Sequence, residues 1–274
     1  KSGWRTMPPI LPRKLSSFSV VRRKRPWIPG VENPLSDHQY SNVIDGSKLR
    51  ILARDLFPDW VQVGVEAVTE VDLLAEENAH WQRLSSSFAE SRQRQFIAGR
   101  RAASTGLKSL GAEAFGKLGM GEDQEPVWPP GFCGSITHSK DWALAVVASG
   151  KATPALGVDL EYTNRLSRKT WRMVLRPSEA AWIEKNIPES EQEWFGTLFF
   201  SLKECFYKWQ FPQTRSWLGF QDAELQLDSR GRVGRAVLNL HKPPATPLQK
   251  QDGYFLAYAG SGGFLVTGMW GGAT

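Results

Sequence analysis

Two acidic residues, Asp159 and Glu161, lie two positions apart in the segment Gly157–Glu161. Val158 and Leu160 alternate with them, which predicts a strand, and positions i and i+2 of a strand face the same side. The two carboxylates would then project side by side, about 7 Å apart. Such a pair repels itself unless water or a cation lies between, so the segment indicates either a Mg²⁺ site or an exposed acidic strand face.

A polar stripe runs along a predicted helix over residues 193–211. At 100° per residue, Ser201, Glu204 and Lys208 share this stripe, whereas the apolar side chains fall on one broad arc that must be core. Lys203 lies at the far edge. Taken alone, the stripe is compatible with a surface ion pair between Glu204 and Lys208, worth a few tenths of a kcal/mol.

Two further segments could bind phosphate. A glycine-rich loop over 131–139 ends in Thr137 and His138, so it can offer backbone N–H groups, a hydroxyl and an imidazole. Arg92 and Arg100 lie eight residues apart on a predicted helix, hence on one face, and arginine binds phosphate through two parallel hydrogen bonds. A structural histidine and a solvated basic helix are the alternatives for these segments.

Both strands and helices are needed to position these candidate residues. The predicted strands cover 61–65, 143–148, 156–161, 223–227, 233–240, 254–259 and 264–270. The predicted helices cover 72–84, 91–110 and 193–211, and another begins at Pro177. Residues 119–134 are rich in Gly and Pro and are expected to form a loop. Helices and meandering strands in both halves predict an α+β fold rather than a doubly wound sheet.

Charge is distributed unevenly along the 274 residues. Residues 1–35 hold eight basic side chains and one acidic one, Glu32, whereas the whole chain has a net charge of +6, so the remainder is close to neutral. Residues 1–50 are also rich in Pro and Ser, which predicts a basic extended leader that faces an anionic partner or simply solvent. Two cysteines cannot make a disulfide framework, and no apolar run is long enough to cross a bilayer, so we expect a cytoplasmic protein.

The order of the motifs is more informative than any one of them. The arginines at 92 and 100 are followed by W-P-P-G-F-C-G-S-I-T-H-S, by G-V-D-L-E and by F-S-L-K-E-C-F-Y-K, with a spacing of 45 residues from Asp159 to Glu204. In this order the chain resembles the 4′-phosphopantetheinyl transferases, in the branch typified by enterobactin synthetase component D. The resemblance extends from Arg92 to Trp209, is weaker over 218–270, and leaves residues 1–50 uncovered.

The resemblance implies a fold and a reaction. The fold would have two similar lobes related by a pseudo-twofold axis, each a small antiparallel sheet packed with helices, with the active site between them. Residues 51–150 would form the lobe that contacts the nucleotide of coenzyme A, and residues 151–274 the lobe with the metal site and the catalytic helix. A holo-[acyl-carrier-protein] synthase type of enzyme would move the phosphopantetheine arm of coenzyme A to a serine of an apo acyl or peptidyl carrier protein, for siderophore, polyketide or fatty-acid synthesis.

The resemblance also implies roles for single residues. Asp159, Glu161 and Glu204 match the acids that bind Mg²⁺, and Glu204 also matches a general base, with Lys208 as the second catalytic residue. Contacts with coenzyme A are implied for Arg92, Arg100, Thr137, His138, Asp159, Lys203 and Lys208.

Two positions depart from the family's pattern. Asp123-Gln124-Glu125 occupies a loop where members often have Lys or Arg, so one phosphate contact is missing or comes from elsewhere. Cys205 replaces the commoner Ser after Lys-Glu, on the apolar side of the helix, and we expect that change to be neutral.

Two other classes of protein remain as alternatives. A metal-dependent nuclease combines similar residues around Mg²⁺, but it should have a basic body, and here the basic charge is confined to the leader. A non-catalytic binding module with a basic arm would not need the acids and Lys208. We therefore expect coenzyme A and a carrier protein as partners, no nucleic acid, and a monomer; the basic leader allows peripheral membrane association.

Overall fold

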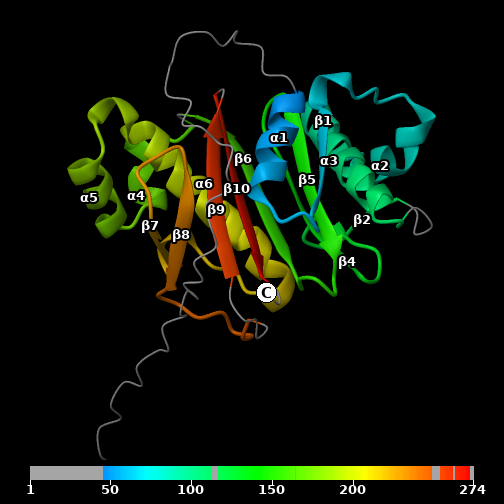
Figure 1. Cartoon of the computed structure of the whole chain (residues 1–274). Helices are drawn as coiled ribbons and strands as arrows, with labels where there is room; N and C mark the ends of the chain where they lie inside the picture. The colour runs from blue at the N-terminus through cyan, green and yellow to red at the C-terminus, as the bar shows by residue number, and fades with distance from the viewer. Residues whose placement is uncertain (1–45, 113–116, 164, 249–253, 262, 272–274) are drawn as a thin grey trace, which may run out of the picture.

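The computed structural model describes residues 46–112, 117–163, 165–248, 254–261 and 263–271. Figure 1 shows two antiparallel sheets side by side, each with one long helix packed against it. This arrangement confirms the predicted α+β class. The pseudo-twofold axis and the domain limits at 50 and 150 stay predictions.

The first sheet has the strand order β1 (Gln62–Ala67), β5 (Trp142–Ser149), β4 (Phe132–His138). Helix α3 (Glu90–Ser109) packs on β1 and β5. Residues 143–148 of β5 are fully buried, because this central strand lies between α3 on one face and the core on the other. The sheet thus presents β4, with Thr137 and His138 near its end, at one edge.

The second sheet has the strand order β6 (Leu156–Tyr162), β10 (Phe264–Gly271), β9 (Tyr254–Ser261), β8 (Val233–Leu240), β7 (Ala223–Leu227). Helix α6 (Gln192–Thr214) packs on β6 and β10. The helix approaches β6 closely at Gly157, where a Cβ atom would come within 2.3 Å of the Cys205 carbonyl oxygen. Strand β6 and helix α6, which carry the predicted acids, are therefore in direct contact.

The two sheets meet where β4 lies beside β6. Two side-chain hydroxyls join them: the backbone N–H of Val158 donates to Ser135 Oγ (3.1 Å), and that of Leu160 donates to Thr137 Oγ1 (3.2 Å). A single buried cluster draws side chains from both sheets, including Leu144 and Phe264. Helix α1 (Gly46–Leu56) packs on this cluster and contacts both sheets.

Short elements complete the described chain. They are η1 (Val68–Glu70), η2 (Glu76–Asn78), α2 (Ala79–Leu84), β2 (Gly119–Met120), β3 (Pro126–Val127), η4 (Arg168–Thr170), α4 (Trp171–Val174), α5 (Pro177–Asn186), η5 (Glu189–Glu191) and η6 (Phe220–Asp222).

Some predicted elements differ from the observed ones. The predicted helix over 72–84 is helical only from Glu76, because the Asp72 carboxylate accepts the backbone N–H of Leu74 and holds a local turn instead. Residues 46–50, expected in the leader, begin α1, and Leu49 is buried; the rest of the leader lies outside the described residues. Within the described part of the chain, no helix is both long and apolar enough to span a bilayer.

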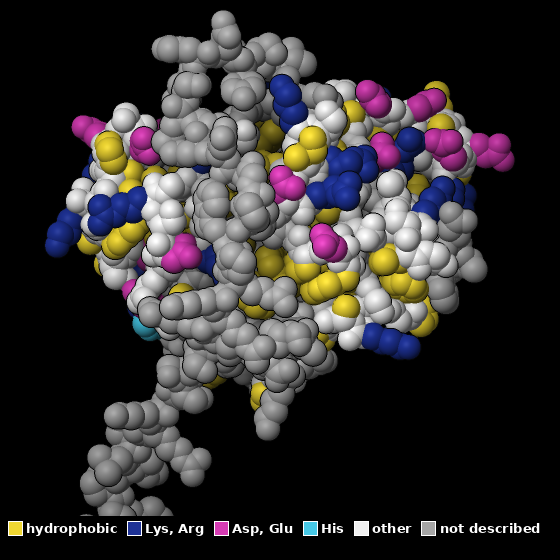
Figure 2. All heavy atoms as spheres, viewed as in Figure 1, with side chains coloured by type: hydrophobic (Ala, Val, Ile, Leu, Met, Phe, Trp, Pro, Cys, Tyr) yellow, Lys and Arg dark blue, Asp and Glu magenta, His cyan; other side chains and the backbone are white. Residues whose placement is uncertain are grey.

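Figure 2 shows the face of the molecule viewed in Figure 1. Lys and Arg side chains are interspersed there with Asp and Glu side chains over the described residues. Nucleic-acid-binding proteins gather basic side chains on one face or stripe. The mixed charge of this face is what the near-neutral sequence after the leader predicts.

Candidate active site

The Asp159 carboxylate lies where the two sheets meet. It is only 3% exposed and accepts hydrogen bonds from three side chains. Thr137 on β4 donates to Oδ1 (3.1 Å), Ser201 on α6 donates to Oδ2 (2.8 Å), and the Lys208 ammonium on α6 donates to Oδ1 (2.6 Å). The structure thus brings together three of the predicted residues, and it adds Ser201, whose signal in the sequence was its place on the polar stripe of the helix.

Two further carboxylates, those of Glu161 and Glu204, interact electrostatically with Asp159. Burial raises the pKa of Glu161 to about 7, and the negative charge of Asp159 adds to the shift, against Arg165 and Lys208. Burial also raises the pKa of Glu204, where Lys208 lowers it and Asp159 raises it further. Asp159 therefore disfavours the charged forms of Glu161 and Glu204, which is the condition that a bound cation relieves.

The three acids suit a hard cation in kind, because carboxylate oxygens are the ligands that Mg²⁺ and Ca²⁺ prefer. No group of three or more His, Cys, Asp or Glu side chains within the described residues is assembled as a metal site. Instead, Lys208 supplies the counter-charge to Asp159, with a side chain that is partly buried. Burial alone would lower the pKa of Lys208, but Asp159 and then Glu204 raise it overall. The residues fit Mg²⁺ by donor type, with Lys208 as the present partner of Asp159.

A second polar group joins the start of α3 to the end of β4. Arg92 donates a hydrogen bond from Nη1 to Nε2 of His138. Burial lowers the pKa of His138 to about 4, and the positive charges of Arg92 and Lys208 lower it further, so the ring is neutral and can accept that bond. The structure confirms that these two predicted residues meet.

Arg100 lies beside this pair and lacks partners. It is 4% exposed, and its Nε and Nη2 atoms find no hydrogen-bond partner among the described residues. Its guanidinium lies over the Phe96 ring, 4.3 Å from the centroid, and burial together with Arg92 lowers its pKa to about 10. A buried cation without partners is costly, so this geometry indicates a place for an anion.

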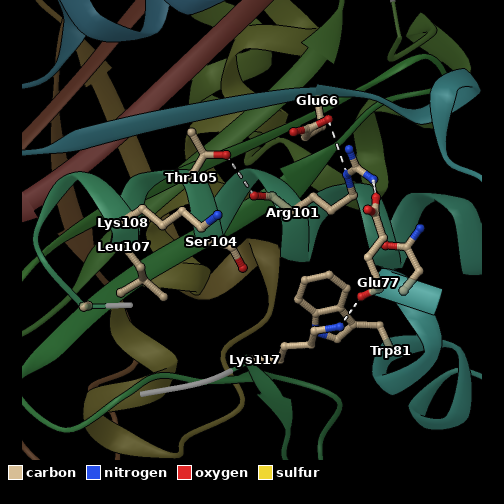
Figure 3. Close-up of a pocket in the computed structure, with 11 residues that line it drawn as sticks. Glu66, Glu77, Trp81, Arg101, Ser104, Thr105, Leu107, Lys108 and Lys117 are labelled. Carbon is tan, nitrogen blue, oxygen red and sulfur yellow. Dashed lines mark hydrogen bonds and ion pairs between the residues drawn. The ribbon is translucent and has the colours of Figure 1, made fainter. Parts of the chain in front are cut away.

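The next residue, Arg101, faces elsewhere. It forms ion pairs with Glu66 (3.6 Å) and Glu77 (2.7 Å) on the rim of a cavity of about 540 Å³ (Figure 3). Trp81 and Lys117 also line this cavity, and none of the predicted site residues does. Two adjacent arginines of α3 thus have different surroundings, which makes Arg101 a matched control for Arg100.

The structure does not bring Lys203 to this site. Its buried ammonium donates to the Val174 carbonyl (2.9 Å), the Phe220 carbonyl (2.9 Å) and the Glu179 carboxylate (2.7 Å). All three N–H donors are used within the C-terminal half, so we withdraw the expected contact between Lys203 and coenzyme A. Burial lowers the pKa of Lys203 and raises that of Glu179, and the pairing works against both shifts.

This pairing predicts a stability effect. Replacing Lys203 with Met should lower the free energy of unfolding by about 3–5 kcal/mol, because it leaves the Glu179 carboxylate buried and unpaired. The double variant Lys203→Met with Glu179→Gln should recover part of that loss in a denaturant titration. A single variant as stable as the wild type would contradict this structural role.

The acidic loop before β3 faces a cation at the C-terminal end of α6. Arg215, which caps α6 in a left-handed conformation (φ 51°), bonds to Glu125 at 2.5 Å and approaches Asp123 at 3.8 Å. Its hydrogen bond lowers the pKa of Glu125.

The hydroxyl of Tyr207 is buried without a partner among the described residues, and burial raises its pKa to about 12, with Asp123 and Glu204 adding to the shift. The sequence alone indicated neither Arg215 nor Tyr207.

Cys205, the second position that departs from the pattern of the resembled family, is fully buried in the core between α6 and the second sheet. Its thiol has a pKa raised mainly by burial. The predicted apolar environment of this position is confirmed.

Comparison with known proteins gives matches over most of the described chain. Residues 80–148 match the family model described as the 4′-phosphopantetheinyl transferase N-terminal domain, and residues 155–259 match that of the 4′-phosphopantetheinyl transferase superfamily. These two ranges include every predicted site residue.

Individual relatives agree with the family models. The chain is 34% identical to the 4′-phosphopantetheinyl transferase PptT of Mycobacterium tuberculosis, over 58% of this chain and 72% of that protein. It is 31% identical to the 4′-phosphopantetheinyl transferase Svp of Streptomyces mobaraensis, over 78% and 87%. It is 33% identical to enterobactin synthase component D of Salmonella typhi, over 61% and 65%. The chain therefore belongs to the 4′-phosphopantetheinyl transferase superfamily.

Proposed function

We propose that this protein transfers the 4′-phosphopantetheine arm of coenzyme A to a serine of an apo carrier protein and releases 3′,5′-ADP. The observation that carries the proposal is the convergence of Thr137, Ser201 and Lys208 on the buried Asp159 carboxylate. It places a carboxylate of β6 and an ammonium of α6 at one point beside β4, and a reaction at a pyrophosphate requires charged groups held in this way. The family assignment supports the same activity.

The nucleotide end of coenzyme A would bind at the first lobe. Arg92 can donate to a phosphate once its hydrogen bond to His138 is given up, and the neutral His138 ring has one N–H to donate. Arg100 has unpartnered N–H groups, which suit bidentate bonding to an anion. Thr137 is engaged with Asp159 and with the backbone of β6, so we assign it to holding Asp159 in place rather than to binding phosphate directly.

Asp159, Glu161 and Glu204 would hold a Mg²⁺ ion. Bound there, Mg²⁺ would supply charge neutralisation at the pyrophosphate, as metal ions do in phosphoryl transfer. Lys208, now paired with Asp159, would place its ammonium against the same phosphates. The raised pKa of Glu161 and that of Glu204 support this set, because like-charged neighbours in a buried site are stabilised by an added cation.

In the transfer step one bond to phosphorus forms and one breaks, and Glu204 and Lys208 handle the proton and the charge. The serine Oγ bonds to the β-phosphorus, while the bond from that phosphorus to the oxygen shared with the α-phosphate breaks, so 3′,5′-ADP leaves with this oxygen. The serine proton passes to Glu204, whose raised pKa is closer to the pH at which a general base works. Lys208 stabilises the charge that develops on the leaving group.

The carrier would be an acyl or a peptidyl carrier protein. Enterobactin synthase component D is named for siderophore assembly, and its similarity to this chain favours a siderophore carrier among the substrates. We assign the enzyme to the holo-[acyl-carrier-protein] synthase type on the same basis, with polyketide and fatty-acid carriers as further candidates.

A loading assay tests this function. The protein is incubated with coenzyme A, Mg²⁺ and a panel of apo carriers of the three pathways, and the carriers are weighed by intact mass spectrometry. We expect at least one carrier to gain a phosphopantetheine arm, and we expect no gain when its serine is replaced by alanine. Failure with every carrier, from a protein that melts cooperatively, would refute the proposed function.

A further inference from the structure

Thr267 is a polar residue in an otherwise apolar row of β10. Its neighbours on the same side of the strand, Leu265 and Met269, belong to the buried cluster between the second sheet and α6. Thr267 itself is 0% exposed. A hydroxyl in such a row costs free energy unless it finds a hydrogen-bond partner, so the position of this residue needs an explanation.

The partner of Thr267 is Ser201 on α6. The two hydroxyl oxygens lie 3.0 Å apart, and Thr267 Oγ1 also donates to the Ser201 carbonyl oxygen (3.0 Å). Ser201 is fully buried as well, and its Oγ lies 2.8 Å from Asp159 Oδ2. The three side chains thus form one chain of hydrogen bonds from β10 through α6 to β6.

The direction of this chain follows from the chemistry of its members. An ionised carboxylate only accepts hydrogen bonds, so Ser201 gives its single hydroxyl hydrogen to Asp159. At the contact between the two hydroxyls, Thr267 is therefore the donor and Ser201 the acceptor. Hydrogen bonds in series polarise one another, so Thr267 strengthens the bond from Ser201 to Asp159 without touching the carboxylate.

Strand register explains why Thr267 lies where it can act in this way. Thr267 and Asp159 are directly opposite each other in the antiparallel pair of β10 and β6. Residues opposite each other present their side chains on the same face of the sheet, and α6 packs on both of these strands. Ser201 bonds to both side chains, so the chain closes across one strand pair and the helix that covers it.

The hydrogen bonds to Asp159 fix the orientation of its carboxylate. Oδ1 accepts from Thr137 (3.1 Å) and Lys208 (2.6 Å), whereas Oδ2 accepts from Ser201 alone among the described residues. A carboxylate oxygen has two acceptor positions, so Oδ2 keeps one for a further partner. The side chain that determines how this oxygen is turned is Ser201.

We propose that Thr267 is a positioning residue for phosphopantetheine transfer, acting through Ser201 to orient Asp159. The proposal rests on the proposed function, because it assigns a role within the same site. A serine in a helix commonly donates to the carbonyl four residues earlier, and the Thr267 hydroxyl favours the rotamer that donates to Asp159 instead. Thr267 thereby holds a ligand of the proposed Mg²⁺ site ready, from a strand that carries none of the three acids.

Removing the hydroxyl tests this role. Thr267→Val keeps the shape of the side chain and should lower kcat for carrier loading about tenfold, since losing a group that orients a metal ligand commonly costs about 10–100-fold. The affinity for coenzyme A, measured by isothermal titration calorimetry without a carrier, should fall by a similar factor with Mg²⁺ present and stay unchanged without it. Thr267→Ser retains the hydroxyl and should restore both values.

A double-mutant cycle separates positioning from a general contribution to packing. If Thr267 acts through Ser201, the variant Ser201→Ala/Thr267→Val should be no slower than Ser201→Ala alone, whereas independent effects would multiply. The control Thr197→Val makes the same replacement at a fully buried threonine one turn earlier in α6, whose hydroxyl bonds to Glu193 and Leu166. It should lower the free energy of unfolding and leave kcat and the affinity for coenzyme A unchanged.

The outcomes distinguish this role from the proposed function. A wild-type protein that loads no carrier would refute the function. If the wild type loads carrier, normal kinetics in Thr267→Val, or a double variant slower than Ser201→Ala by the full factor of Thr267→Val, would overturn the positioning role. Denaturant titration shows which variants are folded, and Thr267→Ala replaces Thr267→Val in the cycle if the valine variant is not.

Discussion

Replacing Glu204 with Gln should lower the rate of carrier loading by about 10²–10⁴-fold, because the serine loses its proton acceptor. Replacing Asp159 with Asn should lower the rate at least as much, since the amide keeps the shape but loses the charge that orders Lys208 and would bind Mg²⁺. Both variants should retain the wild-type circular dichroism spectrum. Single-turnover loading, followed by intact mass, measures the chemical step directly.

The control for these acids is Glu184→Gln. Glu184 lies on α5, is half exposed and pairs with Arg168, away from Asp159. Its replacement should leave the loading rate within about twofold of the wild type, since exposed ion pairs contribute little. Normal turnover in either variant, Glu204→Gln or Asp159→Asn, would remove that residue from the reaction and overturn the proposed set of three metal ligands.

Replacing Arg100 with Leu should move stability and substrate binding in opposite directions. Removing a buried, unpartnered cation should raise the free energy of unfolding by about 1–4 kcal/mol, since an apolar side chain carries no desolvation penalty. The same change should raise the KM for coenzyme A by about 10–100-fold, because a hydrogen bond to a charged group contributes about 1.5–3 kcal/mol. Denaturant titration without substrate and initial rates at varied coenzyme A measure the two effects.

Arg101→Gln is the matched control for Arg100. It removes a cation from the next position of α3, but one that is paired with Glu66 and Glu77. We expect a small loss of stability and an unchanged KM. A stabilised Arg100→Leu protein with normal coenzyme A kinetics would mean that the guanidinium meets no phosphate.

Local patterns were sufficient to predict the parts of the site that depend on one element. Alternation along β6 identified Asp159 and its neighbour, and helical periodicity placed Ser201 and Lys208 on one stripe of α6. The strand order that brings β4 to β6 is not written in either pattern. It brings Thr137 to Asp159, and the packing of α6 on β6 brings Lys208 there, whereas the sequence alone allowed an ion pair between Lys208 and Glu204.

Contacts between distant segments could not be predicted from the sequence. Helical phase put Lys203 at the edge of the polar stripe, but only the packing of α4 and η6 over it reveals that its three donors are already used. Glu125 and Arg215 are 90 positions apart, and no periodicity relates them. The helix at Gly46 was missed because basic, proline-rich sequence precedes it without a break in composition.

The apolar cluster that draws Leu144 from the first sheet and Phe264 from the second has a consequence for engineering. The two halves of the chain cannot be exchanged freely with the corresponding halves of relatives, because they share one buried cluster. Consider a chimera of the first half of this protein and the second half of a relative about one-third identical. Its shared apolar cluster would contain side chains from two proteins whose shapes do not match. Each overpacked position would cost about 1–3 kcal/mol. Altering which carrier such an enzyme accepts is therefore better attempted on the surface, where an exchange of side chains leaves the common interior untouched.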